Sequence, residues 1–96
     1  MKNIPIGTLR YIVMLDDGLN YNQIAASIGK SHQAITQAIT AAEKSTKLSL
    51  VHSSRQGNTL TEIGERIAVL ARRAVVRYDQ TIAFINLMQK VSKNDN

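Results

Sequence analysis

One apolar spacing occurs twice in the first half of this 96-residue chain, and it constrains the fold more than any other feature. Within residues 21–28 and 35–42, apolar side chains recur at positions i, i+3, i+4 and i+7, as on one face of an α-helix. The two sets are Tyr21, Ile24, Ala25 and Ile28, and Ile35, Ala38, Ile39 and Ala42. Asn20 and Ser31 are good N-caps for these helices, and Gly29 can end the first. The sequence therefore predicts two short helices joined by a tight turn, a helix-turn-helix.

The opposite face of the second helix contains no carboxylate. It carries amide, hydroxyl and ammonium groups at helical spacing, from Gln33, Thr36, Gln37, Thr40 and Lys44. Gln can pair with the adenine edge in the major groove of DNA, and Thr can contact the thymine methyl group, whereas Asp or Glu would repel phosphates. An ordinary solvated face, which usually mixes both charge signs, is the alternative. The missing acids favour a surface that contacts DNA.

A further helix is expected before this pair. Residues 4–15 carry Leu9, Ile12 and Val13 at helical spacing, and the pattern runs into Gly18, which can adopt the left-handed conformation that ends a helix. The three helices together are enough for one small core, and 96 residues are too few for two.

A two-stranded wing is expected after the pair. Leu48, Leu50 and Val51 begin an extended segment, residues 53–58 are turn formers, and extended chain resumes at Thr59. The hairpin tip would hold Arg55, Gln56 and Asn58, side chains that can reach a phosphate or a minor groove. An ordinary flexible loop is the alternative reading of these residues.

A long helix is predicted from Thr61, which can cap it, with Glu62 and Glu65 near its positive end. Its apolar residues advance by alternating steps of three and four, at Ile63, Ile67, Leu70, Ala74, Tyr78, Ile82, Ile85 and Met88. Because such a helix extends past a small core, we expect a homodimer through Ile67 to Met88, with packing back onto its own core as the alternative. The expected organisation is a DNA-binding core of residues 1–60, a dimerisation helix of residues 61–91 and a disordered tail of residues 92–96.

The charge balance supports a polyanion as partner. The chain has a net charge of +5, and the segment between Lys30 and Arg77 carries all of this excess, with eight basic and three acidic residues. The chain has no cysteine and only two histidines, His32 and His52, so we expect neither a metal nor a cofactor. No motif arranges Ser, His and Asp for catalysis, and we expect no enzyme. No secretory signal or membrane-length apolar run is present, which predicts a cytoplasmic protein.

Two linked motifs resemble the N-terminal DNA-binding domain of LysR-type transcriptional regulators. Residues 60–65, Leu-Thr-Glu-Ile-Gly-Glu, are similar to the family's Leu-Thr-Glu-Ala-Gly-Glu, and residues 31–39 are similar to its recognition segment. The two motifs are separated by the same number of residues as in the family, so no insertion or deletion is needed to align them. The chain differs from the family pattern at Gln33, Gln37 and Ser53. These 96 residues include no counterpart of the family's effector-binding domain, so the chain is expected to be either a minimal regulator or an excised DNA-binding domain. The DNA-binding domain of molybdate-responsive regulators is also similar.

The resemblance implies a mainly α-helical fold, a winged helix-turn-helix of three helices and a short β-hairpin, followed by a long linker helix. It implies base reading by Ser31, His32, Gln33, Thr36 and Gln37, and phosphate contacts from Lys30, Thr40, Lys44 and Arg55. The expected function is sequence-specific binding of double-stranded DNA by a homodimer on a pseudo-palindromic operator, with no small-molecule effector. The alternative is a protein-interaction module that antagonises another regulator through the long apolar helix.

Overall fold

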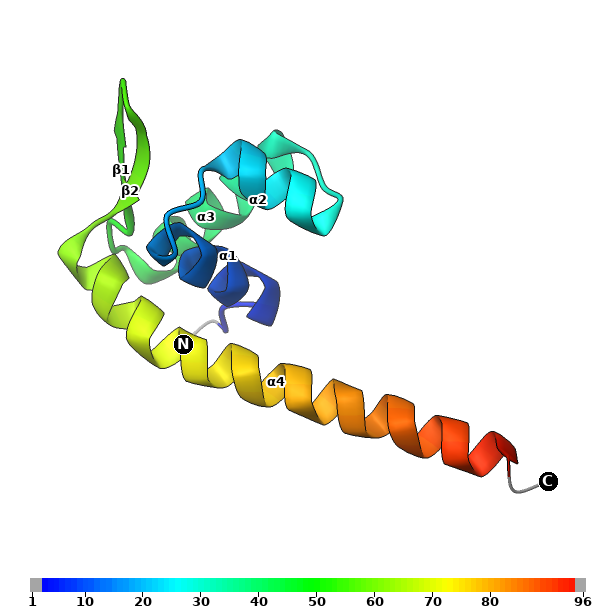
Figure 1. The fold of residues 1–96 in the computed structure, drawn as a ribbon. Coiled ribbons are helices and arrows are strands. Elements are labelled where there is room, and N and C mark those ends of the chain that lie inside the picture. Colours follow the sequence, from blue (N-terminus) through cyan, green and yellow to red (C-terminus); the bar gives the residue numbers. More distant parts are fainter. Residues whose placement is uncertain (1–2, 95–96) are drawn as a thin grey trace.

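The computed structural model describes residues 3–94, and it is mainly helical (Figure 1). Its elements, in chain order, are α1 (Ile6–Asp16), α2 (Tyr21–Ile28), α3 (His32–Thr46), β1 (Val51–Ser54), β2 (Gly57–Leu60) and α4 (Glu62–Asn94). This order confirms the winged helix-turn-helix with a long C-terminal helix that the sequence predicted.

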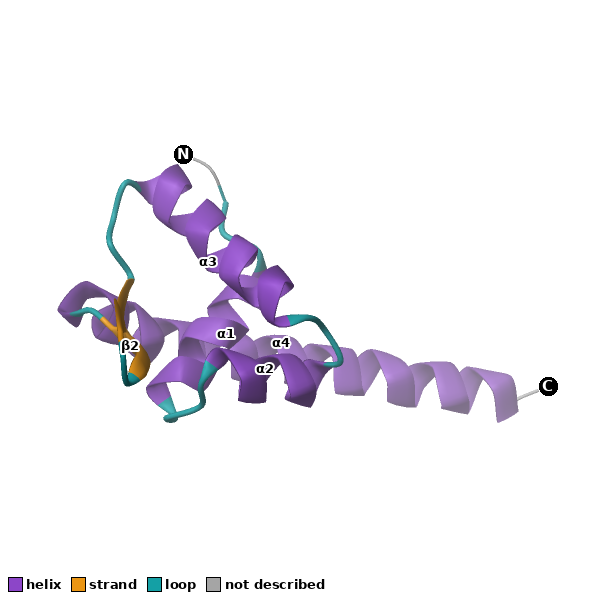
Figure 2. Cartoon of the chain, turned by 90° about the horizontal axis from the view of Figure 1, so that it is seen from above, coloured by secondary structure: helices purple, strands orange, loops and turns teal. Residues whose placement is uncertain are grey.

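The helix-turn-helix is α2 and α3 (Figure 2), and the expected residues determine the ends of the two helices. The Asn20 side chain accepts a hydrogen bond from the Gln23 backbone N–H at 2.8 Å, and the Gln23 side chain accepts one from Asn20 N–H at 2.9 Å. Ser31 Oγ accepts from Ala34 N–H at 3.1 Å and so caps α3. Gly29 ends α2 at a φ of 69°, in the left-handed region that favours glycine.

The first helix begins two residues later than expected, at Ile6 rather than Ile4. Pro5 is the N-cap, and its carbonyl oxygen accepts from the backbone N–H groups of Thr8 and Leu9. A residue that precedes proline is disfavoured in the helical region, which keeps Ile4 out of the helix.

The core lies between α1, α2, α3 and the base of the hairpin. Ile12, Ile24 and Ile35 are its largest fully buried side chains, one from each of the first three helices. Leu50 and Leu60, at the two ends of the hairpin, are buried in the same cluster. The predicted apolar stripes of α2 and α3 therefore face this core.

The wing is an antiparallel pair that projects from the helices (Figure 1). Ser53 pairs with Asn58 and Ser54 with Gly57, so only Arg55 and Gln56 remain at the tip. The expected six-residue turn was wrong, because four of its turn-forming residues lie in the strands. Asn58 accordingly lies in β2 and not at the tip.

The long helix α4 packs against α1 along its first half. Ala68, Ala71 and Val75 are its buried residues on this side, and their small side chains allow a close approach. Two sets of ion pairs flank this contact: Arg10 with Asp79, and Arg72 with Asp16 and Asp17.

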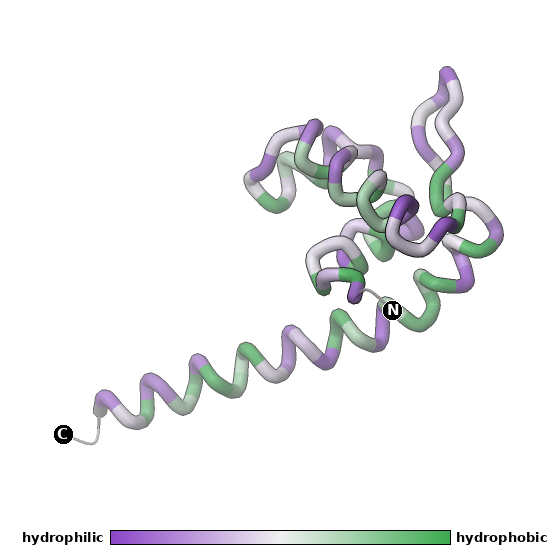
Figure 3. The backbone as a smooth tube through the Cα atoms, turned by 180° about the vertical axis from the view of Figure 1, so that it is seen from behind, coloured by the Kyte–Doolittle hydropathy of each residue, from purple (hydrophilic) through white to green (hydrophobic). Residues whose placement is uncertain are grey.

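The second half of α4 leaves the core, and apolar residues continue along it (Figure 3). From Gln80 to Lys93 every side chain is exposed. The helix ends at Asn94, three residues past the expected end, since nothing after Gly64 breaks it. The expected tail is thus helical at residues 92–94, and residues 95–96 lie outside the described part.

Candidate nucleic-acid interface

One face of α3 is covered by the protein and the other is open. Ile35, Ile39 and Ala42 are buried on the covered face. Of the residues expected on the open face, Thr36 is half-buried and the rest are exposed: Gln33, Gln37, Thr40 and Lys44. Among residues 3–94, neither Gln33 nor Gln37 makes a side-chain hydrogen bond. Both amides are therefore free to bind another molecule.

Two hydroxyl groups of the expected reading face already have partners. Ser31 Oγ accepts from Ala34 N–H, and Thr36 Oγ1 donates to the His32 carbonyl oxygen at 3.2 Å. Ser31 can still donate its hydroxyl proton, whereas Thr36 can still offer its methyl group and accept a hydrogen bond at its hydroxyl oxygen.

The His32 ring lies at the start of α3 and is held from α2. Its Nδ1 is 2.7 Å from Asn22 Oδ1, and its ring meets the Tyr21 ring edge-on, with centroids 5.7 Å apart. Sequence reasoning gave no role to Asn22, since nothing in its neighbourhood signals a contact ten residues away.

The wing is anchored to α3 by a carboxylate. Glu43 Oε2 accepts from the backbone N–H of Leu50 at 2.8 Å and of Val51 at 3.3 Å. Just after β2, Thr61 Oγ1 donates to the Ser49 carbonyl oxygen at 2.7 Å. The Glu43 bonds fix the base of the hairpin relative to α3, and the Thr61 bond joins the two ends of the hairpin; sequence reasoning had assigned neither.

A polar cavity of about 270 Å³ lies between α3 and the wing, with His32, Thr36 and Thr40 on one wall and Ser53 and Asn58 on the other. Asn58 Oδ1 accepts from Ser53 Oγ at 2.8 Å. The half-buried Asn58 thus faces α3, while Arg55 and Gln56 are exposed at the wing tip.

Tyr21 is buried beside the same cavity. Burial raises the pKa of its phenol, and the Glu43 carboxylate raises that pKa further. The hydroxyl therefore keeps its proton and can act as a donor.

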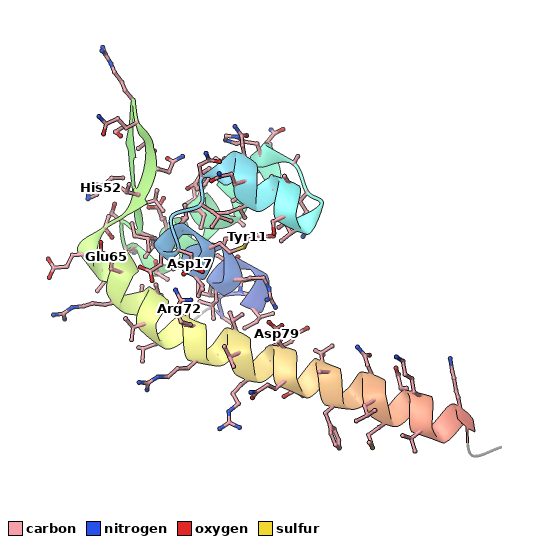
Figure 4. The ribbon with its side chains drawn as sticks, viewed as in Figure 1. Tyr11, Asp17, His52, Glu65, Arg72 and Asp79 are labelled. Atoms are coloured by element: carbon pink, nitrogen blue, oxygen red, sulfur yellow. The ribbon has the colours of Figure 1, made fainter. Side chains whose placement is uncertain are left out.

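The basic segment does not form one surface. Lys30, Lys44 and Arg55 are exposed on the turn, α3 and the wing, but Arg72 is bound to Asp16 and Asp17 at 3.1 and 2.7 Å, as Figure 4 shows for Asp17. The remaining arginines, Arg66, Arg73 and Arg77, share one exposed face of α4. The expectation of a single polyanion-binding surface is corrected accordingly, because part of the basic excess belongs to α4.

Arg10 and Asp79 form a two-bonded pair between α1 and α4, with distances of 2.9 and 2.7 Å. These hydrogen bonds hold the pKa of Asp79 below its ordinary value and raise the pKa of Arg10. The pair holds α4 against α1 through two parallel contacts.

No group of three or more metal-ligating side chains occurs within residues 3–94. No helix in that range is both long and apolar enough to span a bilayer.

The expected dimer stripe remains open in the single chain. Ile67 packs partly against the core, while the other members are exposed: Leu70, Ala74, Tyr78, Ile82, Ile85 and Met88. The face of α4 that packs on α1 is instead the stripe of small residues around Ala71.

No protein-family model matches the chain, and no curated protein matches it in sequence. Solved structures do resemble it. OxyR from Corynebacterium glutamicum has a TM-score of 0.83 and 17% identity over 90% of this chain and 28% of its own. DarR from Vibrio fischeri, solved in complex with DNA, has a TM-score of 0.76 and 21% identity over 94% of this chain and 31% of its own.

A third similar structure is CbnR, described as a LysR family transcriptional regulator and solved with its target DNA. It has a TM-score of 0.73 and 22% identity over 85% of this chain and 28% of its own. This chain thus spans less than a third of each of these three regulators. At such identities the likeness establishes the fold: the chain has the fold of the matching part of LysR-type regulators, as its motifs suggested.

Proposed function

We propose that this chain binds double-stranded DNA with α3 in the major groove and regulates transcription, as a member of the LysR-type regulators. The observation that carries the proposal is the one-sided burial of α3. Its apolar face packs on the core, and its open face presents unpaired amides. The nearest carboxylate of α3, Glu43, is half-buried and bonded to the wing. The similar structures solved with DNA support the same reading.

The proposed base-reading residues lie along the open face and at the start of α3: Ser31, His32, Gln33, Thr36 and Gln37. The proposed phosphate contacts are Lys30, Thr40, Lys44 and Arg55. In the wing, Arg55 and Gln56 at the tip would reach the backbone or the minor groove, and Asn58 would act from the cavity between wing and helix.

We infer further that the functional unit is a homodimer joined through the exposed stripe from Ile67 to Met88. The stripe supports this because most of its apolar side chains are left in water by the single chain. A twofold dimer would present two copies of α3, so the operator should be pseudo-palindromic. We propose that the protein acts on DNA in the cytoplasm.

Selection of bound duplexes from a random pool tests the proposal. We expect an enriched motif with two related half-sites, and affinity that falls steeply with salt because several Lys and Arg side chains neutralise phosphates. If the bound duplexes shared no sequence motif, the proposed sequence specificity would be refuted. If the motif were a single unpaired half-site, the proposed dimer would be refuted.

The second candidate is an interaction module that blocks another regulator, and the apolar free half of α4 favours it. A mobility-shift series across salt concentrations separates the two. An antagonist alone would show no retarded duplex at low salt, whereas a DNA-binding protein must.

A further inference from the structure

The contact between Asn22 and His32 joins the first turn of α2 to the first residue of α3. Both side chains are exposed, so the 2.7 Å contact is not a by-product of core packing. It is the one hydrogen bond of the His32 side chain among residues 3–94. The Tyr21 ring, at an interplanar angle of 78°, supports the imidazole from the side.

The orientation of the Asn22 amide decides which ring nitrogen carries the proton. The amide oxygen faces the ring, and because that oxygen can only accept, Nδ1 of His32 donates in this arrangement. In a neutral imidazole the proton on Nδ1 leaves Nε2 as an acceptor. His32 is thereby an acceptor at the end of α3 where recognition helices meet base edges.

We propose that Asn22 is a positioning residue that makes His32 a reader of amino-bearing bases. Nε2 would accept from the N6 amino group of adenine or the N4 amino group of cytosine. It would be disfavoured opposite guanine or thymine, whose corresponding groups are acceptors. The inference rests on the proposed docking of α3 in the major groove and deepens it, since it gives one residue a base class.

The test is selection from a random duplex pool at pH 8, with the wild-type chain and variants. The wild type should prefer adenine or cytosine over guanine or thymine at one position by about three- to tenfold, the worth of one hydrogen bond. His32→Ala should lose it at that position alone. Ser27→Ala, an exposed change elsewhere on α2, should match the wild type.

Asn22→Ala is the decisive variant. It frees the ring to exchange its proton between the two nitrogens, so the preference at that position should weaken without loss of binding. Asn22→Asp keeps an oxygen that accepts from Nδ1 and should keep the preference. An Asn22→Ala pool profile identical to that of the wild type would overturn the inference.

Nitrogen NMR of the free protein gives a readout independent of DNA. The His32 ring should show a protonated Nδ1 and a bare Nε2 at pH 8, and Asn22→Ala should shift it to a mixture. A ring protonated on Nε2 in the wild type would also overturn the inference. If the chain bound no duplex at all, the proposed function would be refuted instead. The experiments therefore distinguish a failure of this inference from a failure of the proposed function.

Discussion

Gly64 lies directly against the carbonyl oxygen of Leu50, so closely that a Cβ on Gly64 would overlap that oxygen. The same Cβ would also lie 3.3 Å from the Leu60 side chain. The first turn of α4 can therefore approach the base of the wing only with glycine at this position. This contact, and not a need for an unusual backbone angle, accounts for the glycine of the Leu-Thr-Glu-Ile-Gly-Glu segment.

Gly64→Ala should destabilise the protein by about 1–3 kcal/mol, because the buried backbone must shift to admit a methyl group. Gly7→Ala is the matched control, since its Cβ would meet only the Tyr11 hydroxyl at 4.0 Å within the helix α1. That change should be neutral or stabilising, by up to about 1 kcal/mol. Urea unfolding followed by circular dichroism measures both, and equal effects would refute the close contact.

Glu43→Ala should loosen the wing. The change leaves the Leu50 and Val51 N–H groups without their acceptor, at a cost of about 1–3 kcal/mol. Hydrogen exchange at these two amides should speed up more than at α2. Glu43→Gln keeps an acceptor oxygen and should increase the exchange rate of these amides less than Glu43→Ala does. A larger increase for Glu43→Gln than for Glu43→Ala would contradict the assigned bonds.

The ion pair between Arg10 and Asp79 should make stability depend on acid. The Asp79 pKa is lower in the folded chain than its ordinary value, chiefly through the hydrogen bond from Arg10. The ion pair therefore adds to the free energy of unfolding above about pH 4, where a free aspartate is ionised. This stabilisation is lost as the pH falls through the lower pKa that Asp79 has in the folded chain. Asp79→Asn should flatten this part of the stability profile between pH 5 and pH 2. An unchanged acid profile in thermal melts would show that the pair contributes nothing.

Gln37→Ala should change the sequence preference of DNA binding, whereas Lys44→Ala should change the affinity for all sequences. Losing the Gln37 amide should relax preference at one base step, at a cost of about 1–3 kcal/mol on the selected site. Losing the Lys44 ammonium should weaken binding to every sequence alike and reduce the salt slope by about one. Titrations on the selected duplex and on a scrambled one measure this, and equal losses on both duplexes from both changes would rule out the assignment.

Ile85→Asp and Phe84→Asp test the dimer face. The two residues are neighbours on the free half of α4, and at 44% and 61% exposed neither supports the core. Only Ile85 belongs to the proposed stripe, since successive residues lie about 100° apart around a helix. Sedimentation should show a monomer for Ile85→Asp and a dimer for Phe84→Asp. The reverse result would move the interface to the other face.

The features that could be predicted from the sequence are those fixed by neighbours in the chain. Asn20, Gly29 and Ser31 determine the ends of α2 and α3 through bonds to residues within four positions. The apolar stripes then decide which faces turn inward, so the open face of α3 was accessible to the same reasoning.

The missed features depend on residues far apart in sequence. Propensity made Ser53 and Asn58 look like turn residues, but the burial of Leu50 and Leu60 fixes the strand register that pairs them. On α4 the large apolar residues dominate the helical pattern, but the contact with α1 is made by alanines such as Ala68. Alanine is common on both buried and exposed helix faces, so the sequence pattern does not predict this contact. The contact between Asp79 and Arg10 spans 69 positions and leaves no local trace.

The way α4 is attached leaves its C-terminal end without support from the core. The Arg10–Asp79 ion pair is the last bond between α4 and the core in the described part of the chain, and about 20 Å of helix continue beyond Asp79. A tilt of α4 by roughly ten degrees at Asp79 would move its C-terminal end by about 3.5 Å, close to the rise of one base pair. If two chains join through these free ends, the tilt that the packing of α4 on α1 allows near Val75 and Asp79 limits how much variation in operator length the two chains can accommodate.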